Sequence, residues 1–243
     1  MKKKTSINIG TSGWNYKHWK GNFYPEGIPQ KKWLEYYITK FSTVELNNTF
    51  YRLPLVSTFK KWHDSTPENF LFSVKASRFI THIKRLNEPE EPVDKFISSA
   101  KNLKTKLGPV LFQLPPGFKY DPERLECLLK ILPPKLRYTF EFRNSTWWND
   151  ETYQLLRRYN SAFCIFELGE IISTKEVTAD FVYIRLHGPS GRYSGDYDKH
   201  TIKEWADLFN QWKKEDKDIF CYFDNDERGF AAKNALDLKE MVG

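Results

Sequence analysis

Strand-like and helix-like segments alternate along this chain, and this alternation constrains its fold more than any other feature. Runs rich in β-branched and aromatic residues predict eight strands, at residues 6–12, 42–50, 70–77, 109–114, 137–143, 162–168, 181–188 and 218–225. Apolar residues at helical spacing separate most of these runs, although the interval 169–180 is too short for a comfortable helix. A repeated order of strand and helix requires parallel strands that are joined by crossovers.

Eight such repeats predict an α/β fold, a single-domain (β/α)8 TIM barrel over residues 1–243 with its active-site mouth at the carboxyl ends of parallel strands. The alternative is an open, doubly wound sheet, but no GxGxxG motif follows the first strand. No linker or low-complexity tract marks a second domain.

Composition narrows the setting of the protein. Lys and Arg exceed Asp and Glu by 38 − 31 = +7, a basic balance that suits an anionic ligand. Three cysteines without CxxC spacing predict reduced and mostly buried thiols, at Cys127, Cys164 and Cys221. The first residues lack the apolar stretch of a signal peptide, and no window approaches the length of a membrane span. We therefore expect a cytoplasmic protein without a membrane partner.

Polar residues interrupt the predicted strands at period two, near their carboxyl ends. In one strand Glu141 and Arg143 alternate with the apolar Phe140 and Phe142. A spacing of two residues places each polar set on one face of its strand. The apolar residues between them lie on the opposite face, which packs against the helices. The polar sets should converge in the barrel mouth, and they are Glu45 and Asn47, Ser73 and Lys75, Gln113, Glu141 and Arg143, Glu167, Arg185 and His187, and Tyr222 and Asp224.

Packing alone explains some of these residues but not the whole set. A single buried ion pair can serve to fix packing, and a lone buried amide or histidine is more often a hydrogen-bonded core residue. Burial of so many charges costs several kcal/mol per ion unless each is paired. Aromatic residues just past the strand ends suit a flat ligand such as a sugar or a base. Four further histidines are expected at the surface, at His18, His63, His82 and His200.

Seven linked stretches run in order along essentially the whole chain. They are "GTSGWNYKHWKGNFYP" (10–25), "TVELNNTFYRLP" (43–54), "FLFSVKASRFITH" (70–82), "LGPVLFQLPP" (107–116), "EFRNSTWW" (141–148), "TADFVYIRLHG" (178–188) and "YFDNDERGFAAKNA" (222–235). Together they resemble the DUF72 family, also called YecE-like proteins. The resemblance implies a TIM barrel in a prokaryotic cytoplasmic protein, and it leaves the activity open because the family is named as a domain of unknown function.

The resemblance also assigns motif residues. The matching positions are Trp14, Glu45, Asn47, Tyr51, Lys75, Gln113, Glu141, Arg143, Trp147, Arg185, His187, Asn225 and Asp226. The chain departs from the family at Asp224, where relatives usually carry Asn, and at Glu167, where they carry an Asp on the sixth strand.

The favoured interpretation is a metal-independent enzyme without a cofactor that acts on a small anionic substrate by acid/base chemistry. Guanidinium groups suit a phosphate- or carboxylate-bearing, sugar- or nucleotide-like substrate. The predicted catalytic residues are Glu45, Lys75, Glu141 and His187. The predicted substrate-binding residues are Trp14, Asn47, Tyr51, Gln113, Arg143, Trp147, Arg185, Tyr222, Asp224 and Asn225. Asn225 and Asp226 are further predicted to cap the last helix, which follows them directly.

Other interpretations stay open. A divalent-metal enzyme similar to sugar isomerases or epimerases would use as ligands Glu141, Glu167, His187 and Asp224. A nucleic-acid-processing or nucleic-acid-binding barrel fits the basic balance but is not favoured, because a zinc endonuclease would need more strand-end histidines than His187. Glu45 and Glu141 would be the acid pair of a glycoside hydrolase. A non-catalytic ligand-binding barrel is the remaining alternative, and the sequence leaves the oligomeric state open.

Overall fold

The computed structural model describes residues 5–243. The strands are β1 (Ile7–Thr11), β2 (Thr43–Leu46), β3 (Leu71–Lys75), β4 (Leu107–Leu114), β5 (Tyr138–Phe142), β6 (Ala162–Leu168), β7 (Ile171–Ile172), β8 (Phe181–Leu186) and β9 (Asp218–Phe223). The helices are α1 (Trp33–Tyr37), α2 (Asn48–Tyr51), α3 (Val56–Asp64), α4 (Glu90–Ala100), α5 (Pro122–Ile131), α6 (Asp150–Arg158), α7 (Lys199–Lys214) and α8 (Phe230–Val242). A π-helical turn, η3 (Phe79–Ile83), precedes α4.

The strands form one sheet whose order is nearly the order of the sequence. Neighbours follow the path β1-β9-β8-β6-β5-β4-β3-β2, and β7 pairs with β6 off this path. The two ends of the path meet in a parallel bridge between Ser12 and Glu45. Beside this bridge, Gly13 N donates to Glu45 O at 2.9 Å. This is the strand order of a (β/α)8 barrel, and the predicted fold class is confirmed.

The second predicted strand differs from the observed one, and the interval 169–180 contains a short strand that was not predicted. The second strand was expected over 42–50, but it ends at Leu46 and the chain turns into α2. The Thr49 hydroxyl stabilises this turn because it donates to the carbonyl oxygens of Leu46 at 3.0 Å and of Lys75 at 2.6 Å. The interval 169–180 contains no helix but the short strand β7, which runs antiparallel to β6.

The described chain divides into two compact units. The terminal unit contains the residues up to Glu45, Ile165–Lys175 and Asp180–Gly243, and the central unit contains Leu46–Cys164 and Glu176–Ala179. The single domain over residues 1–243 stays a prediction. Each unit carries its own share of the predicted site residues.

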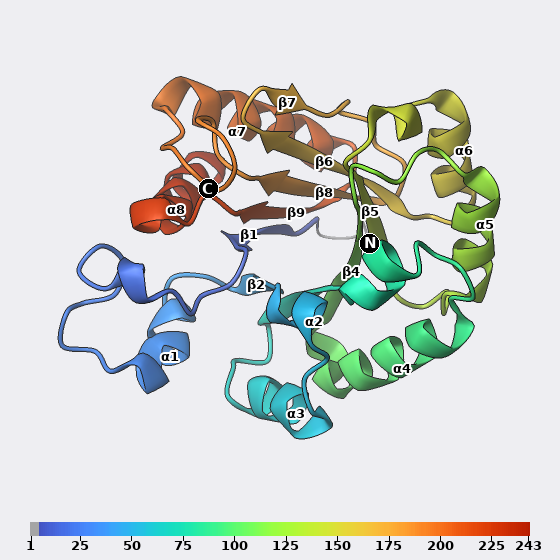
Figure 1. Ribbon diagram of the computed structural model, residues 1–243. Helices are drawn as coiled ribbons and strands as arrows, with labels where there is room; N and C mark the ends of the chain where they lie inside the picture. The colour runs from blue at the N-terminus through green and yellow to red at the C-terminus, as the bar shows by residue number, and fades with distance from the viewer. Residues whose placement is uncertain (1–4) are drawn as a thin grey trace. The chain divides into compact units, whose positions relative to one another are not determined.

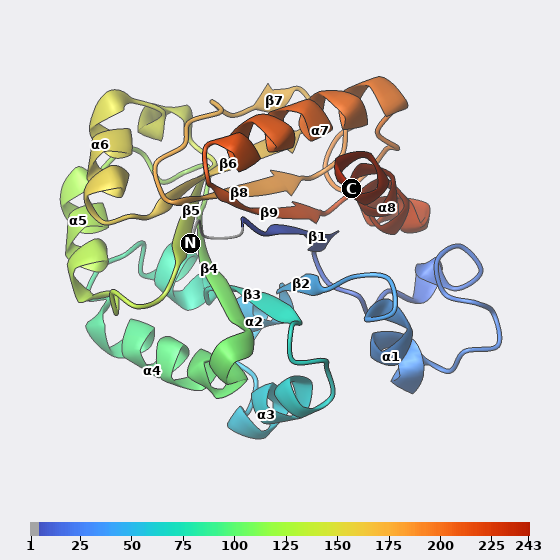
Figure 2. The ribbon, with the colours of Figure 1, turned by 180° about the vertical axis from the view of Figure 1, so that it is seen from behind.

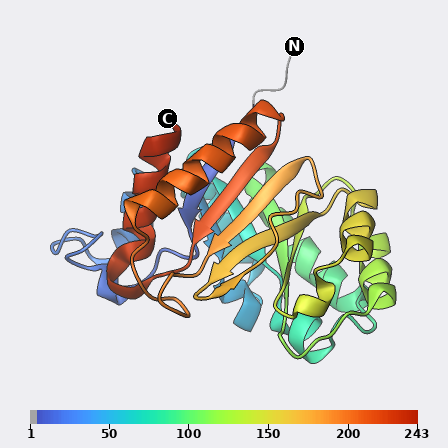
Figure 3. The same ribbon diagram turned by 90° about the horizontal axis from the view of Figure 1, so that it is seen from above.

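In the terminal unit, β8, β9 and β1 lie side by side (Figure 1). Helices α7 and α8 lie against each other and next to β9, as the view from above shows (Figure 3). Gly10 of β1 allows a close approach of β2, because a Cβ atom there would lie 2.4 Å from the carbonyl oxygen of Thr43. A larger residue at this position would push the two strands apart.

In the central unit, the apolar faces of the strands pack against helices. The ring of Phe142 stacks on Trp147 at 4.7 Å and on Phe163 at 5.9 Å. Tyr153 of α6 meets Phe163 edge-on at 5.3 Å. Figure 2 shows α4, α5 and α6 following one another beside β4 and β5. The apolar residues of β5 therefore face the helices, and Glu141 lies on the opposite face of the strand.

Two further sequence predictions concern thiols and membranes. Cys164 and Cys221 are buried and Cys127 is exposed, which agrees with the prediction of mostly buried thiols. On α5 the buried residues include Leu125 and Leu128, which lie on the opposite side of the helix from Cys127. Within residues 5–243, no helix has the length and apolar character needed to cross a membrane.

Candidate functional site

Arg185 of β8 forms a buried ion pair with Glu45 of β2 in the terminal unit. Arg185 Nε lies 3.1 Å and 3.0 Å from the two carboxylate oxygens of Glu45, and Nη2 lies 2.8 Å from Oε1. Arg185 is 1% exposed and Glu45 is 0% exposed. Several charge-assisted hydrogen bonds between the same two groups offset the cost of removing both charges from water.

Two hydroxyl groups complete the surroundings of the Glu45 carboxylate. Tyr183 Oη donates to Oε2 at 2.6 Å, and Ser12 Oγ donates to Oε1. The pKa of Tyr183 is raised well above its usual value, first by burial and then by the negative charge of Glu45. Tyr183 therefore stays protonated and keeps donating. The negative charge of Glu45 is matched inside the protein by these donors and Arg185.

Asp224 and His187 continue this network. Arg185 Nη2 donates to Asp224 Oδ2 at 2.9 Å, and Arg185 Nη1 lies 3.2 Å from His187 Nε2. His187 Nδ1 lies 2.9 Å from the same oxygen of Asp224. A guanidinium can only donate, so Nε2 of His187 is the acceptor in this contact. Nδ1 lies close to the Asp224 carboxylate but makes no hydrogen bond with it among the described residues. A carboxylate close to an imidazole is a common arrangement in proton-transfer sites.

Negative charge accumulates beside Asp224. The pKa of Asp226 is raised, first by burial and then by the charge of Asp224. The pKa of Tyr16 is also raised, first by burial and then by the same two carboxylates. His18 Nε2 lies 3.4 Å from Asp226 Oδ2 in a partly exposed pair. This side of the network therefore disfavours an anionic ligand.

The predicted capping of the last helix by the side chains of Asn225 and Asp226 is wrong. Helix α8 starts after Gly229, which has φ +81° and offers no side-chain cap. Asp226 makes no capping hydrogen bond with its side chain. Asn225 Nδ2 donates to Asn234 Oδ1 at 2.9 Å, and it is the backbone carbonyl of Asn225 that accepts from Ala231 N, at 2.9 Å.

His82 marks a second cluster, in the central unit. It lies on η3, which Lys84 N closes by donating to Phe79 O at 2.8 Å. The pKa of His82 is lowered to about 4, first by burial and then by nearby cations. These cations are Lys75, Arg78 and Arg143, and Glu141 opposes them. The imidazole is therefore neutral near pH 7 and able to accept a proton.

Glu141 of β5 pairs with Arg143, which follows it by two residues on the same side. Arg143 Nε donates to Glu141 Oε1, and the side chains are 11% exposed for Arg143 and 0% exposed for Glu141. Lys75 Nζ lies 4.5 Å from the centroid of the Phe50 ring, which also meets the ring of His82 at 4.9 Å. Cations outnumber carboxylates here, so we call Lys75, Arg78, His82, Glu141 and Arg143 the cationic cluster.

Four other predicted residues of the central unit differ widely in exposure. Trp147 has no exposed surface, and its Nε1 donates to a backbone carbonyl at 2.8 Å. Gln113 is 8% exposed and donates to the carbonyl of the next residue at 3.2 Å. Tyr51 is 73% exposed. The Oδ1 atom of Asn47 is buried and accepts no hydrogen bond from the residues that the structure describes.

Two predicted residues of the terminal unit complete the set. Tyr222 is buried, and its hydroxyl lies 2.7 Å from Thr43 Oγ1. Trp14 is half-buried, and its carbonyl oxygen accepts a hydrogen bond from the Tyr24 hydroxyl. Their predicted role in substrate binding stays a prediction.

Glu167 faces helix α7, which corrects its predicted inward position. Its carboxyl is surrounded by Lys175 and by hydrogen bonds from Trp205 and Tyr197, and burial raises its pKa. The preceding residue, Phe166, is the one that meets the His187 ring, at 6.2 Å. A metal ligand set that joins Glu167 to His187 is therefore wrong. Across residues 5–243, no group of three or more His, Cys, Asp or Glu side chains is placed to hold a metal ion.

The sequence predicts His82 at the surface, but the structure places it in the cationic cluster. The structure shows it half-buried on a π-helical turn. Such turns are rare, occur often at functional sites and leave no periodic pattern in a sequence. The available signal was the basic stretch "RFITHIKR", in which several cations surround one histidine.

Comparisons with known proteins identify a family and several relatives. The family described as "Protein of unknown function DUF72" matches residues 8–243. The UPF0759 protein YunF of Bacillus subtilis (strain 168) is 29% identical over 269 residues, which cover 97% of this chain and 94% of YunF. The UPF0759 protein YecE of Escherichia coli (strain K12) is 30% identical over 141 residues, which cover 57% of this chain and 48% of YecE.

Solved structures agree with these matches. A DUF72 family protein from Thermotoga maritima MSB8 is 30% identical and superposes with a TM-score of 0.89, covering 98% of this chain and 99% of that protein. A DUF72 family protein from Enterococcus faecalis V583 is 20% identical with a TM-score of 0.84, covering 97% of this chain and 95% of that protein, and it bears on the fold alone. The resemblance in the sequence is thus confirmed, and this chain belongs to the DUF72 family.

Proposed function

We propose that this protein is a metal-independent enzyme that binds a small anionic substrate at the cationic cluster of the central unit. The observation that carries the proposal is the convergence of three cations on the half-buried imidazole of His82. Positive charge in excess, partly removed from water, attracts an anion more strongly than the same charges on an open surface.

Arg143 and Lys75 are the residues proposed to hold the anionic group. The guanidinium of Arg143 is planar and matches the oxygens of a phosphate or carboxylate, and Lys75 supplies a compact ammonium. Each side chain is largely buried, at 11% exposed for Arg143 and 8% for the Lys75 residue. The exposed ring of Tyr51 is available for the sugar- or base-like body of the substrate.

His82 and Glu141 are the proposed proton carriers of the cationic cluster. A neutral imidazole accepts a proton, and the adjacent cations stabilise the negative charge that develops on a deprotonated substrate. Of the predicted catalytic residues, Lys75 and Glu141 belong to this cluster. In the terminal unit, His187 is the residue best suited to proton transfer, because Asp224 lies 2.9 Å from its Nδ1.

Charge also favours metal-independent chemistry at the cationic cluster. A divalent cation placed there would be repelled by the cations around His82. Arg185 is left out of the proposed anion site because its donors already meet Glu45, Asp224 and Ser12. Glu45 and Arg185 are assigned instead to holding the shape of the terminal unit.

Thermal unfolding in inorganic phosphate tests the proposal. A ligand that binds the folded state raises the melting temperature by mass action, so phosphate should stabilise the protein more than chloride does at equal ionic strength. Arg143→Met and Lys75→Met should each remove most of this difference. Lys60→Met is the matched control, since Lys60 is an exposed lysine of α3 in the same unit.

The outcomes separate binding from catalysis. Equal stabilisation of the wild type, Arg143→Met and Lys60→Met by phosphate would mean that the salt acts through general exclusion from the surface, and the anion site would be abandoned. Incubation with sugar phosphates and sugar acids, followed by ¹H and ³¹P NMR spectroscopy, then looks for turnover. Phosphate binding with no turnover of any compound would favour a ligand-binding protein over an enzyme.

A further inference from the structure

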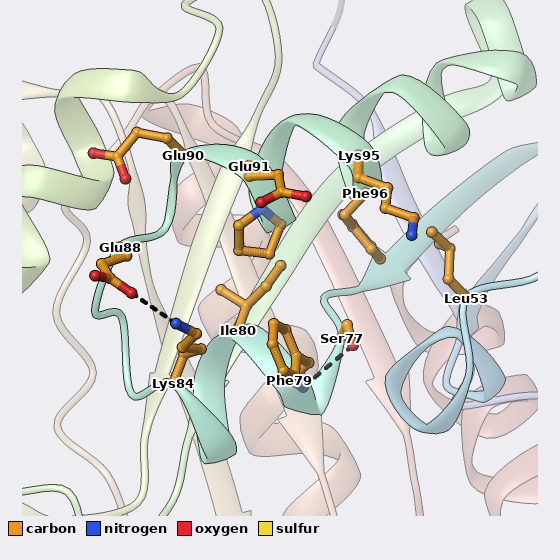
Figure 4. Close-up of a pocket in the computed structure, with 11 residues that line it drawn as sticks. Leu53, Ser77, Phe79, Ile80, Lys84, Glu88, Glu90, Glu91, Lys95 and Phe96 are labelled. Atoms are coloured by element: carbon orange, nitrogen blue, oxygen red, sulfur yellow. Dashed lines mark hydrogen bonds and ion pairs between the residues drawn. The ribbon is translucent and has the colours of Figure 1, made fainter.

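A pocket of about 740 Å³ lies in the central unit, between η3 and the start of α4. Figure 4 shows its lining residues, with Ile80 and Phe79 below the amino-terminal end of α4. Its volume falls within the range of small-molecule sites, roughly 300–1,000 Å³. None of the residues assigned above to the cationic cluster lines it.

Apolar side chains form the floor of this pocket. Ile80 and Phe96 are both 1% exposed, so the floor is fixed in the core of the unit. Phe79 is 45% exposed, and Leu53 closes another side. Contact between this partly exposed ring and an apolar ligand is favourable, because it removes apolar surface of both groups from water.

Charged side chains form the rim. In Figure 4, Glu88, Lys84 and Glu90 stand at one end and Lys95 at the other, with Glu91 on α4 between them. Lys84 Nζ lies 2.7 Å from Glu88 Oε2, so these two charges match each other.

The remaining rim charges have a net negative sign. Within the described residues, Glu90 and Glu91 take part in no ion pair, and Lys95 is the single further cation of the lining. Both acids stand in the first turn of α4, where the helix dipole favours them. The rim therefore offers a carboxylate to a cationic group that enters above an apolar floor.

We propose that this pocket binds an amphipathic amine, a molecule with an aromatic or branched apolar body and one ammonium group. The apolar body lies on Phe79, Ile80 and Phe96, and the ammonium meets Glu90 or Glu91. The proposal is independent of the anionic substrate proposed above, because the two ligands have opposite charge and share no lining residue.

Three probes with the same ring test it by calorimetric titration of the whole protein. They are 2-phenylethylamine, which is cationic at pH 7, 2-phenylethanol, which is neutral, and phenylacetate, which is anionic. The amine should bind about two- to fivefold more tightly than the alcohol, as expected for one partly exposed ion pair. Phenylacetate should bind most weakly.

Two variants separate the apolar and charged parts of the site. Phe79→Ser should weaken the binding of the amine and of the alcohol, and Leu55→Ser is its control because Leu55 is 74% exposed and outside the lining. The double variant Glu90→Gln and Glu91→Gln should remove the advantage of the amine and leave the alcohol unchanged. Its control is Glu35→Gln, an exposed first-turn acid of α1.

Two results of these titrations would contradict the proposed amine site. Equal affinities of the three probes for the wild type would remove the assigned preference for an amine. Unchanged amine binding in Phe79→Ser would place the binding outside this pocket. Far-ultraviolet circular dichroism of each variant shows that the fold is retained, and the half-exposed position of Phe79 makes retention the expected result.

Discussion

Arg185 and Glu45 are buried together, and one guanidinium meets both oxygens of one carboxylate, at 2.8 Å in the closest contact. The pair joins β8 to β2, two strands that lie far apart in the sequence. A buried pair of this kind contributes little net stability while both partners are present, but loss of one partner leaves the other charge uncompensated. The relationship is therefore best tested by removing one partner at a time.

Arg185→Met should lower the free energy of unfolding by about 3–5 kcal/mol, because Glu45 and Asp224 lose their buried cation. Urea denaturation measures the loss. Arg157→Met is the comparison, since Arg157 and Glu176 form a pair at 2.7 Å with exposures of 47% and 39%. It should cost no more than about 1 kcal/mol. Equal losses for the two variants would contradict the buried pairing.

The double variant Arg185→Met and Glu45→Gln extends this prediction. It removes the cation together with one carboxylate, so it should be more stable than Arg185→Met alone. A double variant that is less stable than both single variants would show that Glu45 acts through Tyr183 and Ser12 rather than through Arg185.

His82 should give the protein a measurable dependence on pH. Its pKa is lowered from 6.5 to about 4, so between these values the unfolded state binds more protons than the folded state. The stability should therefore rise as the pH rises from about 4 to 6.5 and then level off. His82→Gln should flatten this part of the stability curve.

The same lowered pKa can be followed directly. A titration of the His82 ring by NMR should have its midpoint near pH 4, and Arg143→Met should raise that midpoint because one cation is removed. Lys60→Met should leave it unchanged, since Lys60 is not among the groups that act on His82. A midpoint that Arg143→Met does not move would separate Arg143 from the cationic cluster.

The fold could be predicted from the sequence because the composition of the strands, the spacing of apolar residues in the helices and the order of these elements all indicated a barrel. The alternation of Phe140 and Phe142 with Glu141 and Arg143 assigned the two faces of β5, since the apolar residues meet helices. The position of Glu167 could not be predicted in this way. Its strand carries apolar residues on both faces, so the alternation of polar and apolar residues does not show which face of the strand carries Glu167.

The contacts that decide the position of Glu167 come from far along the chain. Trp205 and Tyr197 bond its carboxyl, and they belong to α7 and to the loop before it. Similarly, a π-helical turn places His82 near Lys75 and Arg143, which are far apart in the sequence. Both cases depend on tertiary contacts, which no local pattern records.

Glu167→Gln should stabilise the protein at neutral pH. Burial raises the pKa of Glu167, so above the ordinary value of 4.5 the folded state binds more protons than the unfolded state. Stability from this group is then lost as the pH rises through the raised pKa. Gln imitates the protonated acid and still accepts hydrogen bonds. The urea midpoint should rise at pH 7 and change little at pH 4, whereas the exposed Glu170→Gln should show no such difference.

Asp224→Asn should preserve the fold and cost about 1–2 kcal/mol of stability. One oxygen of Asp224 lies 2.9 Å from both Arg185 Nη2 and His187 Nδ1. A single amide oxygen in that place can still accept from Arg185, although without the charge. Urea denaturation beside Arg185→Met would measure the difference.

The same substitution distinguishes metal-dependent chemistry from the proposed mechanism. The chelator-treated protein is titrated calorimetrically with Mg²⁺, Mn²⁺ and Zn²⁺, before and after Asp224→Asn. Arg185 Nη2 already occupies the Asp224 oxygen at 2.9 Å, and a divalent cation would have to displace this positive group before it could bind. We therefore expect no tight binding by either protein. Stoichiometric binding to the wild type that Asp224→Asn abolishes would overturn the metal-independent mechanism, because a hard cation depends on the charge of such a ligand.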